Sequence, residues 1–138
     1  MTERTLTIIK PDSVANHNVG KIIAHLEAEG FTIVAARMQH LTEAQARAFY
    51  EVHKERPFYN DLVAYMTSGP VWPICLERED AVPYLRTVMG ATNPAEADAG
   101  TIRALFGESI ERNSIHGSDS AENAALEISF FFGRAEMV

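Results

Sequence analysis

The sequence predicts an α+β fold, a ferredoxin-like βαββαβ sandwich in which helices cover a four-stranded antiparallel sheet. The first observation is the order of its segments: strand, helix, strand, two helices, strand, two helices, a loop, a helix and a strand, with βαββαβ as the strongest elements. The second is size and composition, because 138 residues with 46% hydrophobic and 22% charged side chains suit one domain, residues 1–138. We expect the helices to lie on one face of the sheet.

The first half of the chain opens with a short apolar run at residues 4–9, which predicts a strand. It stops at Lys10-Pro11, because proline cannot continue a central ladder. Apolar residues at helical spacing from Val19 to Gly30 predict an amphipathic helix, and residues 31–41 read as the second strand.

A second helix is expected to begin at Thr42, because Gln45 stands three residues later as the partner of a capping box. We place Tyr50 and His53 on this helix, where a spacing of three brings side chains to one face.

The middle of the chain predicts a short helix at residues 61–67, a strand at 71–76 and a helix at 80–89. Pro73 interrupts the strand and therefore indicates an edge strand or a bulge.

The segment from Gly90 to Ser120 is weakly structured and too long to be a mere connection, so we expect it to be functional. A short helix capped by Thr101 lies within it. After it, residues 121–127 favour a helix and residues 128–132 a final strand.

Residues 113–120 of that segment hold His116, followed by glycine and three small polar residues. Such residues compete with helix and strand by forming turn-type hydrogen bonds, so we expect His116 at the mouth of a tight loop. A histidine there can act as a nucleophile or a general base, since its pKa ordinarily lies near neutrality. Read alone, the run is as well explained by a polar surface turn.

Charge and cysteine content exclude several classes of function. Twelve basic against nineteen acidic residues give a net charge of −7, which argues against nucleic acid or an anionic membrane as the main partner. The single Cys75 rules out a disulfide framework and a cysteine-rich zinc site, and its apolar surroundings predict a buried, inert thiol. No apolar stretch approaches the roughly 20 residues of a membrane span, so the chain is expected to be cytoplasmic.

Six blocks of sequence resemble the nucleoside diphosphate kinases, in that family's order and spacing, from about Thr5 to Phe132. They are Ile9-Lys10-Pro11-Asp12, Arg56-Pro57-Phe58-Tyr59, Thr67-Ser68-Gly69-Pro70-Val71, Gly90-Ala91-Thr92-Asn93-Pro94, Gly100-Thr101-Ile102-Arg103 and Asn113-Ser114-Ile115-His116-Gly117-Ser118-Asp119-Ser120.

This resemblance implies transfer of the γ-phosphoryl group of a nucleoside triphosphate to a nucleoside diphosphate by a ping-pong mechanism. His116 matches the family's nucleophile, which carries the group as a phosphohistidine. Glu127 matches the carboxylate that accepts a hydrogen bond from the other imidazole nitrogen, with Ser118 in support. A solvated glutamate at a helix end is the alternative for Glu127 when it is read alone.

The resemblance also implies the nucleotide-binding set. Lys10, Arg86, Thr92 and Arg103 match the donors around the phosphates, Asn113 matches the ribose ligand, and Phe58 and Ile110 match the residues on either face of the base. Tyr50, His53 and Asp119 match supporting residues. Mg²⁺ would arrive on the nucleotide phosphates, with no protein side chain as a direct ligand.

The chain departs from the family pattern at Trp72-Pro73, Arg78 and Leu105. Leu105 stands where an aspartate is usual, so one possible partner of Arg103 is lost. We interpret these changes as affecting packing and subunit contacts. Members of the family assemble as tetramers or hexamers built from a common dimer, and the sequence does not choose between them. The alternative function is a nucleotide-binding or interaction module of the same fold with weak catalysis.

Overall fold

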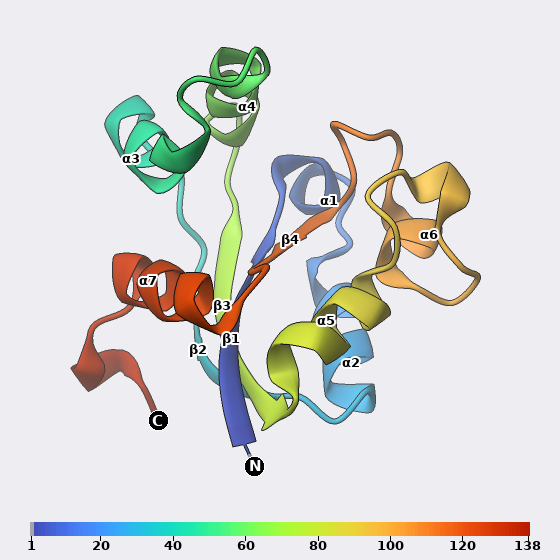
Figure 1. Ribbon diagram of the computed structural model, residues 1–138. Helices are drawn as coiled ribbons and strands as arrows, with labels where there is room; N and C mark the ends of the chain where they lie inside the picture. The colour runs from blue at the N-terminus through green and yellow to red at the C-terminus, as the bar shows by residue number, and fades with distance from the viewer. Residues whose placement is uncertain (1) are drawn as a thin grey trace.

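The computed structural model describes residues 2–138 and contains a four-stranded antiparallel sheet in the order β2-β3-β1-β4 (Figure 1). The strands are β1 (Thr2–Ile9), β2 (Thr32–Ala36), β3 (Trp72–Glu79) and β4 (Ile115–Gly117). Each of the three neighbouring pairs is antiparallel. The predicted α+β class and the four-stranded antiparallel sheet are therefore confirmed.

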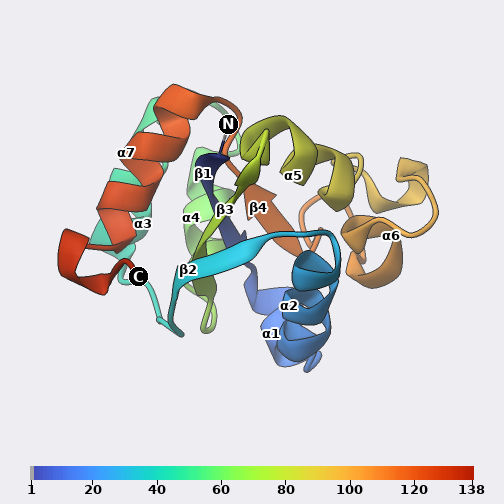
Figure 2. The same ribbon diagram turned by 90° about the horizontal axis from the view of Figure 1, so that it is seen from below.

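Helices cover both faces of this sheet, so the expectation that they lie on one face was wrong (Figure 2). One face of β1 contributes Ile9 to a core with α2 (Val19–Ala28) and α5 (Ala81–Met89). The other face contributes Leu6 and Ile8 to a core with α3 (Glu43–Phe49), α4 (Tyr59–Met66) and α7 (Ala121–Phe131). Successive side chains of a strand point to opposite faces, so an inner strand that is buried on both sides along residues 5–9 serves two cores.

The last strand lies earlier in the chain than the sequence indicated. Residues 128–132 were expected to be a strand, but α7 continues through Phe131 as a helix. Its inward residues Ala124, Ile128 and Phe131 follow helical spacing and pack on the α3–α4 side of the sheet. The fourth strand is instead β4, three residues long, which pairs with the end of β1. Tertiary packing overrode the strand propensity of the aromatic run.

Pro73 lies in an inner strand, so the prediction of an edge was wrong. Its carbonyl accepts from the N–H of Arg37 (3.3 Å), on the side of β2. A residue's N–H and C=O point to the same neighbour in an antiparallel sheet, so the absent N–H also faces β2. The β2–β3 pairing ends one residue away, at Ala36 and Ile74, and the irregularity in register is in β2, between Ile33 and Ala35. Proline here removes no bond to β1.

Two helix boundaries also differ from expectation. The capping box is confirmed, because the Thr42 hydroxyl accepts from Gln45 N–H and the Gln45 side chain accepts from Thr42 N–H. However, α3 ends at Phe49, so Tyr50 follows the helix and His53 lies in a separate 3₁₀ turn, η1 (Glu51–His53). The second strand is likewise shorter than residues 31–41.

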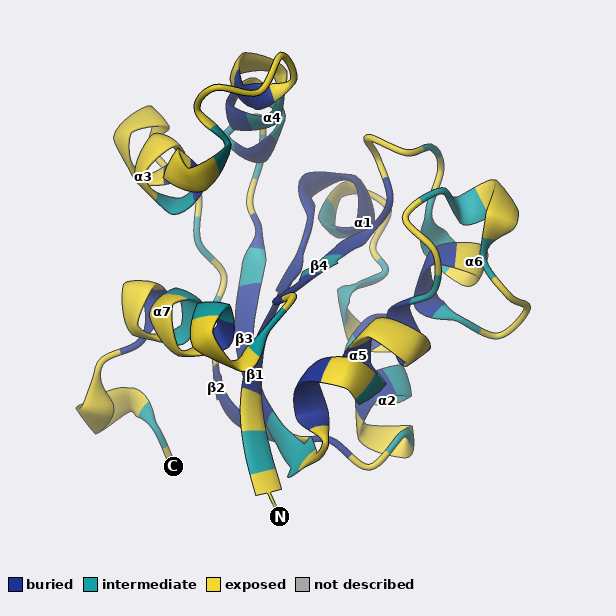
Figure 3. Ribbon diagram, in the orientation of Figure 1, coloured by how far each residue is buried: buried dark blue, intermediate teal, exposed yellow. Residues whose placement is uncertain are grey.

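The remaining elements are α1 (Pro11–Ala15), η2 (Pro94–Glu96), α6 (Ile102–Phe106) and η3 (Arg134–Glu136). Thr101 caps α6 as expected. The central strands are buried along most of their length and the outer helices are exposed on their outward sides (Figure 3). Cys75 is buried in β3 as a free thiol, as predicted, and burial raises its pKa to about 11. No helix among residues 2–138 is long and apolar enough to cross a membrane.

Candidate active site

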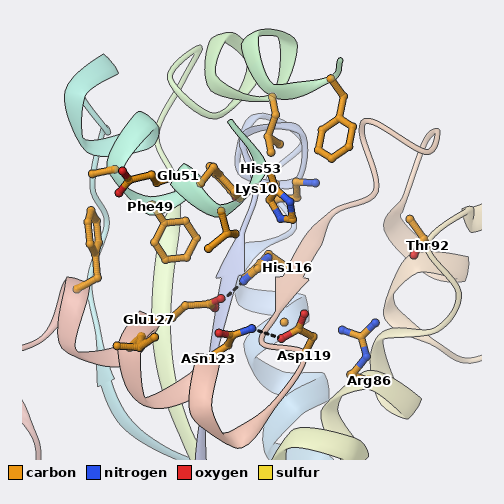
Figure 4. A pocket seen from close by; sticks show the side chains of 18 of the residues that line it. Lys10, Phe49, Glu51, His53, Arg86, Thr92, His116, Asp119, Asn123 and Glu127 are labelled. Atoms are coloured by element: carbon orange, nitrogen blue, oxygen red, sulfur yellow. Dashed lines mark hydrogen bonds and ion pairs between the residues drawn. The ribbon is translucent and has the colours of Figure 1, made fainter. Parts of the chain in front are cut away.

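A cavity of about 820 Å³ opens where β1 ends, beside β4 and between the α3–η1 segment, α5 and α7 (Figure 4). That volume is in the range of small-ligand sites. Most of the predicted site residues line it: Lys10, Tyr50, His53, Phe58, Arg86, Thr92, Arg103, His116, Asp119 and Glu127. Asn113, Ser118 and Ile110 are not among the lining residues that the structure describes.

His116 lies in the middle of β4, so the expectation of a loop mouth was wrong. It pairs with Ile8, and the alternation of the strand directs its side chain to the face that α7 covers. The Thr7 hydroxyl donates to the His116 carbonyl (2.6 Å), which holds the strand edge. A β-carbon on the next residue, Gly117, would lie 2.6 Å from Met89 Sδ of α5. A side chain at this position would force Met89 to shift, so glycine allows α5 to pack close to β4.

Glu127 holds the imidazole of His116 from one side. The His116 Nε2 atom lies 2.8 Å from Glu127 Oε1, and the Ser118 hydroxyl donates to the same oxygen at 2.8 Å. A carboxylate only accepts hydrogen bonds, so Nε2 carries the proton and the lone pair resides on Nδ1. The two side chains are about one-fifth exposed (22% and 20%), so Nδ1 is accessible from the cavity.

Lys10 is a buried ammonium at the carboxyl end of β1. Its Nζ donates to Asn113 Oδ1 (2.8 Å), and Asn113 Nδ2 donates to the Thr92 carbonyl (3.1 Å). The pKa of Lys10 is lowered to about 8, chiefly by burial and then by the charge of Arg103, while Asp12 opposes the shift. A cation whose charged form is disfavoured in this way is suited to receive an anionic ligand.

Arg103 is buried beside Lys10 and is tied to the backbone. Its guanidinium donates to the carbonyls of Gly90 (3.1 Å) and Ile115 (2.9 Å), whereas Leu105, two residues later, is an exposed uncharged side chain. Its Nε is buried and has no partner among residues 2–138. The pKa of Arg103 is lowered to about 10, chiefly by burial and then by the charge of Arg86. The N–H at Nε of this buried cation is thus left for a ligand.

Arg86, Thr92 and Asp119 complete the polar side of the cavity, and each is exposed. Figure 4 shows Arg86 and Thr92 on the opposite side of His116 from Glu127. Asn123 donates to Asp119 Oδ1 (2.6 Å), and this hydrogen bond lowers the pKa of Asp119. No group of three or more His, Cys, Asp or Glu side chains within residues 2–138 is arranged to hold a metal ion.

An aromatic group forms the outer end of the cavity. The Phe58 ring is 47% exposed and lies 5.6 Å from the His53 ring, which in turn lies 6.5 Å from Tyr50. Tyr50 is buried, and burial raises the pKa of its hydroxyl. Ile110 is 53% exposed and outside the cavity lining, so the structure does not bring it together with Phe58 as the second face of a clamp.

Sequence reasoning missed a buried network that shapes the turn before β4. Ser114 has a left-handed backbone (φ 76°), and its N–H donates to Asp12 Oδ2 (3.0 Å). Tyr65 of α4 donates to Asp12 Oδ1 (2.5 Å), and the Ser13 and Ser114 hydroxyls are hydrogen-bonded (2.7 Å). Asp12 ends the first of the six blocks that resemble the family, but no sequence pattern joins it to Tyr65.

The other departures from the family pattern are packing features. Arg78 stacks on the Tyr84 ring (3.6 Å from its centroid) and near Phe31 (5.5 Å). The indole N–H of Trp72 is buried without a partner in the part of the chain that the structure describes. None of these side chains lines the cavity described above.

Comparison with known proteins identifies the family. The family model for nucleoside diphosphate kinase matches residues 3–137. The nucleoside diphosphate kinase of Granulibacter bethesdensis is 59% identical over 136 residues, which are 99% of this chain and 97% of that protein. The Aquifex aeolicus nucleoside diphosphate kinase structure has a TM-score of 0.98 and 45% identity, and each chain is covered completely. The Halobacterium salinarum enzyme, solved in complex with CDP, has a TM-score of 0.95 and 37% identity, covering 100% of this chain and 92% of that one. This chain therefore belongs to the nucleoside diphosphate kinases, a family of phosphotransferases.

Proposed function

We propose that this enzyme transfers the γ-phosphoryl group of a nucleoside triphosphate to a nucleoside diphosphate through a phosphohistidine at His116. One observation supports this proposal. Glu127 Oε1 accepts a hydrogen bond from His116 Nε2 (2.8 Å), which leaves Nδ1 for the cavity that Lys10, Arg86 and Arg103 also line. A nucleophilic nitrogen thus lies in a site that attracts phosphates.

The reaction has two half-reactions at one site. The Nδ1 lone pair attacks the γ-phosphorus, the bond to the bridging oxygen breaks, and the nucleoside diphosphate departs with that electron pair. The Nε2 proton stays on the ring, where Glu127 stabilises the positive charge that develops. A terminal phosphate oxygen of a second nucleoside diphosphate then attacks, and the P–N electron pair returns to Nδ1. Ping-pong kinetics follow.

The cations bind the phosphates and compensate their charge. Phosphoryl transfer needs positioning and electrostatic stabilisation more than covalent help. We assign this role to Lys10, Arg86, Thr92 and Arg103. For Arg103 the donor would be Nε, because it is the guanidinium nitrogen that is buried without a partner among residues 2–138, whereas each terminal nitrogen donates to a backbone carbonyl.

The nucleoside would lie toward the outer end of the cavity. We assign the ribose to Asn113 and Lys10, and the base to the exposed ring of Phe58, with Ile110 on the other face after a local movement. Tyr50, His53 and Asp119 would support these groups. Stacking on an aromatic ring without base-edge contacts tolerates every base. The complex of the Halobacterium salinarum relative with CDP supports a nucleoside diphosphate as ligand.

Kinases of this family use a divalent metal, and we propose Mg²⁺. The residues present fit a metal carried by the nucleotide, because the side of the cavity that would bind phosphate is mainly cationic and Asp119 is its one carboxylate near Arg86. When carried in on the nucleotide phosphates, Mg²⁺ would supply positive charge that compensates the charge of the transferred phosphoryl group.

We further propose that residues 1–138 act as one domain in a homo-oligomer, a tetramer or hexamer built from dimers, as the family resemblance implies. Native mass measurement tests this. We also assign the enzyme to the cytoplasm, as expected from the sequence.

The decisive experiment is labelling with γ-labelled ATP. We expect label that is stable to alkali and labile to acid, located on His116, and absent from His116→Ala. His17→Asn is the control, because this exposed residue lies outside the cavity and asparagine tolerates its left-handed backbone. Full turnover by protein that never carries label would refute the phosphohistidine. Nucleotide binding without turnover would favour a weakly catalytic binding module instead.

A further inference from the structure

Phe49, the last residue of α3, lies directly against the imidazole of His116. The two ring centroids are 5.7 Å apart with planes at 72°, an edge-to-face arrangement. Figure 4 shows Phe49 and Glu127 on one side of His116, and Arg86 and Thr92 on the other. The imidazole therefore has an aromatic side and a cationic side.

The Phe49 ring is itself fixed by Tyr50, the residue after α3, and by α7. Tyr50 packs edge-on against it at 4.9 Å. Phe130 and Phe131 of α7 lie at 5.3 Å and 5.1 Å. Because α3 and α7 hold this ring together, it can restrict the plane of the imidazole, as Glu127 does from Nε2.

The aromatic side of the cavity offers little to orient a water molecule. Its lining includes the hydrocarbon side chains Phe49, Val52, Leu126 and Phe130. Of the polar lining groups near it, Glu127 Oε1 already accepts two hydrogen bonds and the Asn123 amide donates to Asp119, while the carboxylate of Glu51 also lines the cavity. Enzymes that transfer phosphoryl groups to water orient that water with a polar residue, and apolar walls exclude it.

We propose that Phe49 is a positioning residue that directs the phosphoryl group of His116 to a nucleoside diphosphate and away from water. The inference rests on the proposed phosphohistidine. In transfer, a phosphate oxygen of the acceptor attacks phosphorus, the P–N bond breaks and its electron pair returns to Nδ1. In hydrolysis, a water oxygen makes the same attack, and both of its hydrogens leave with the phosphate as dihydrogen phosphate.

The test measures how the phosphoenzyme partitions. Protein labelled from γ-labelled ATP is freed of nucleotide, and release of inorganic phosphate is compared with transfer to added ADP. We expect Phe49→Ala to increase hydrolysis relative to transfer about tenfold, the scale of one aromatic contact. Phe49→Leu, which keeps bulk but loses the ring, should give about threefold.

Phe132→Leu is the matched control, because Phe132 belongs to the same buried cluster but stacks with Arg37 and does not line the cavity. Its partition should equal that of the wild type, whereas a general loosening of the core would shift it as well. A wild-type partition in a folded Phe49→Ala refutes the inference. If that variant does not fold, a wild-type partition in Phe49→Leu refutes it. Wild-type protein without label on His116 would overturn the proposed function, a different result from equal partition among labelled proteins.

Discussion

Replacing Lys10 with methionine should make the unliganded protein more stable at neutral pH while weakening nucleotide binding. Lys10 is only 8% exposed, and its pKa falls from 10.5 to about 8 on folding, chiefly through burial and then through Arg103. A shift of this size corresponds to about 3 kcal/mol of destabilisation when the ammonium is charged. Methionine removes that charge at similar length. It also leaves Asn113 Oδ1 without its donor, which costs about 1 kcal/mol, so we expect a net gain of about 2 kcal/mol.

The destabilisation that Lys10 causes depends on pH. Between pH 8 and pH 10.5 the unfolded chain binds a proton at Lys10 that the folded chain does not, so Lys10 makes wild-type stability rise with pH across this window. Its destabilising effect is fully present below pH 8. The advantage of Lys10→Met should therefore be largest at pH 7 and should shrink toward pH 10.5. Other groups titrate in both proteins and cancel in the difference.

Urea unfolding of both proteins at pH 7 and pH 10 measures this difference directly. The wild type should bind nucleotide more tightly than Lys10→Met. A bound polyphosphate favours the charged form of Lys10, which therefore takes up a proton when the ligand binds near pH 8. Two results would refute the conclusion that the buried Lys10 ammonium destabilises the unliganded protein. One is a Lys10→Met variant that is less stable than the wild type at pH 7, and the other is a stability gain that does not change with pH.

Three further variants probe the elements that build the site. Gly117→Ala should destabilise the fold by roughly 1–3 kcal/mol in thermal unfolding, because its β-carbon would meet Met89 Sδ at 2.6 Å. Its control is Gly20→Ala, which has open space around it in α2 and should stabilise the fold by up to about 1 kcal/mol. Equal effects of the two substitutions on stability would contradict the proposed contact with Met89. Glu127→Gln keeps the shape of the side chain but loses its charge, so kcat should fall about 10²-fold with little change in KM, whereas a change confined to KM would assign Glu127 to binding. Tyr65→Phe removes one donor to Asp12 and should cost about 1–2 kcal/mol in urea unfolding while raising KM; unaltered stability would show that water replaces the hydroxyl.

Much of the fold could be predicted because its signals are local. The capping box at Thr42 and Gln45 and the cap at Thr101 follow from a residue and a partner three positions away. The apolar spacing of α2 and α5 likewise identifies helices before any tertiary contact is known. These elements needed no knowledge of what they pack against.

The wrong predictions concern elements that depend on distant partners. Pro73 reads as an edge signal, yet its missing N–H faces the point where β2 has already ended, which only the sheet register reveals. The burial of Lys10 and Arg103 is equally invisible in sequence, because the carbonyls that bind Arg103 belong to Gly90 and Ile115 on other elements.

The two largest errors, in β4 and α7, fall on the two elements whose side chains form the His116–Glu127 hydrogen bond. Three residues of strand have no propensity signal of their own, and β4 exists because Thr7, Met89 and the backbone of β1 hold it. As a strand, it fixes the direction of His116 by alternation, which a flexible loop would not. As one continuous helix, α7 aligns Glu127 with His116 and sends Phe130 and Phe131 to the Phe49 ring. Had residues 128–132 formed a strand, the carboxylate and the aromatic side of the cavity would have lost their common support. The geometry that makes one imidazole nitrogen a nucleophile is thus a property of the assembled sheet and helix, and could not have been read from residues 113–120 alone.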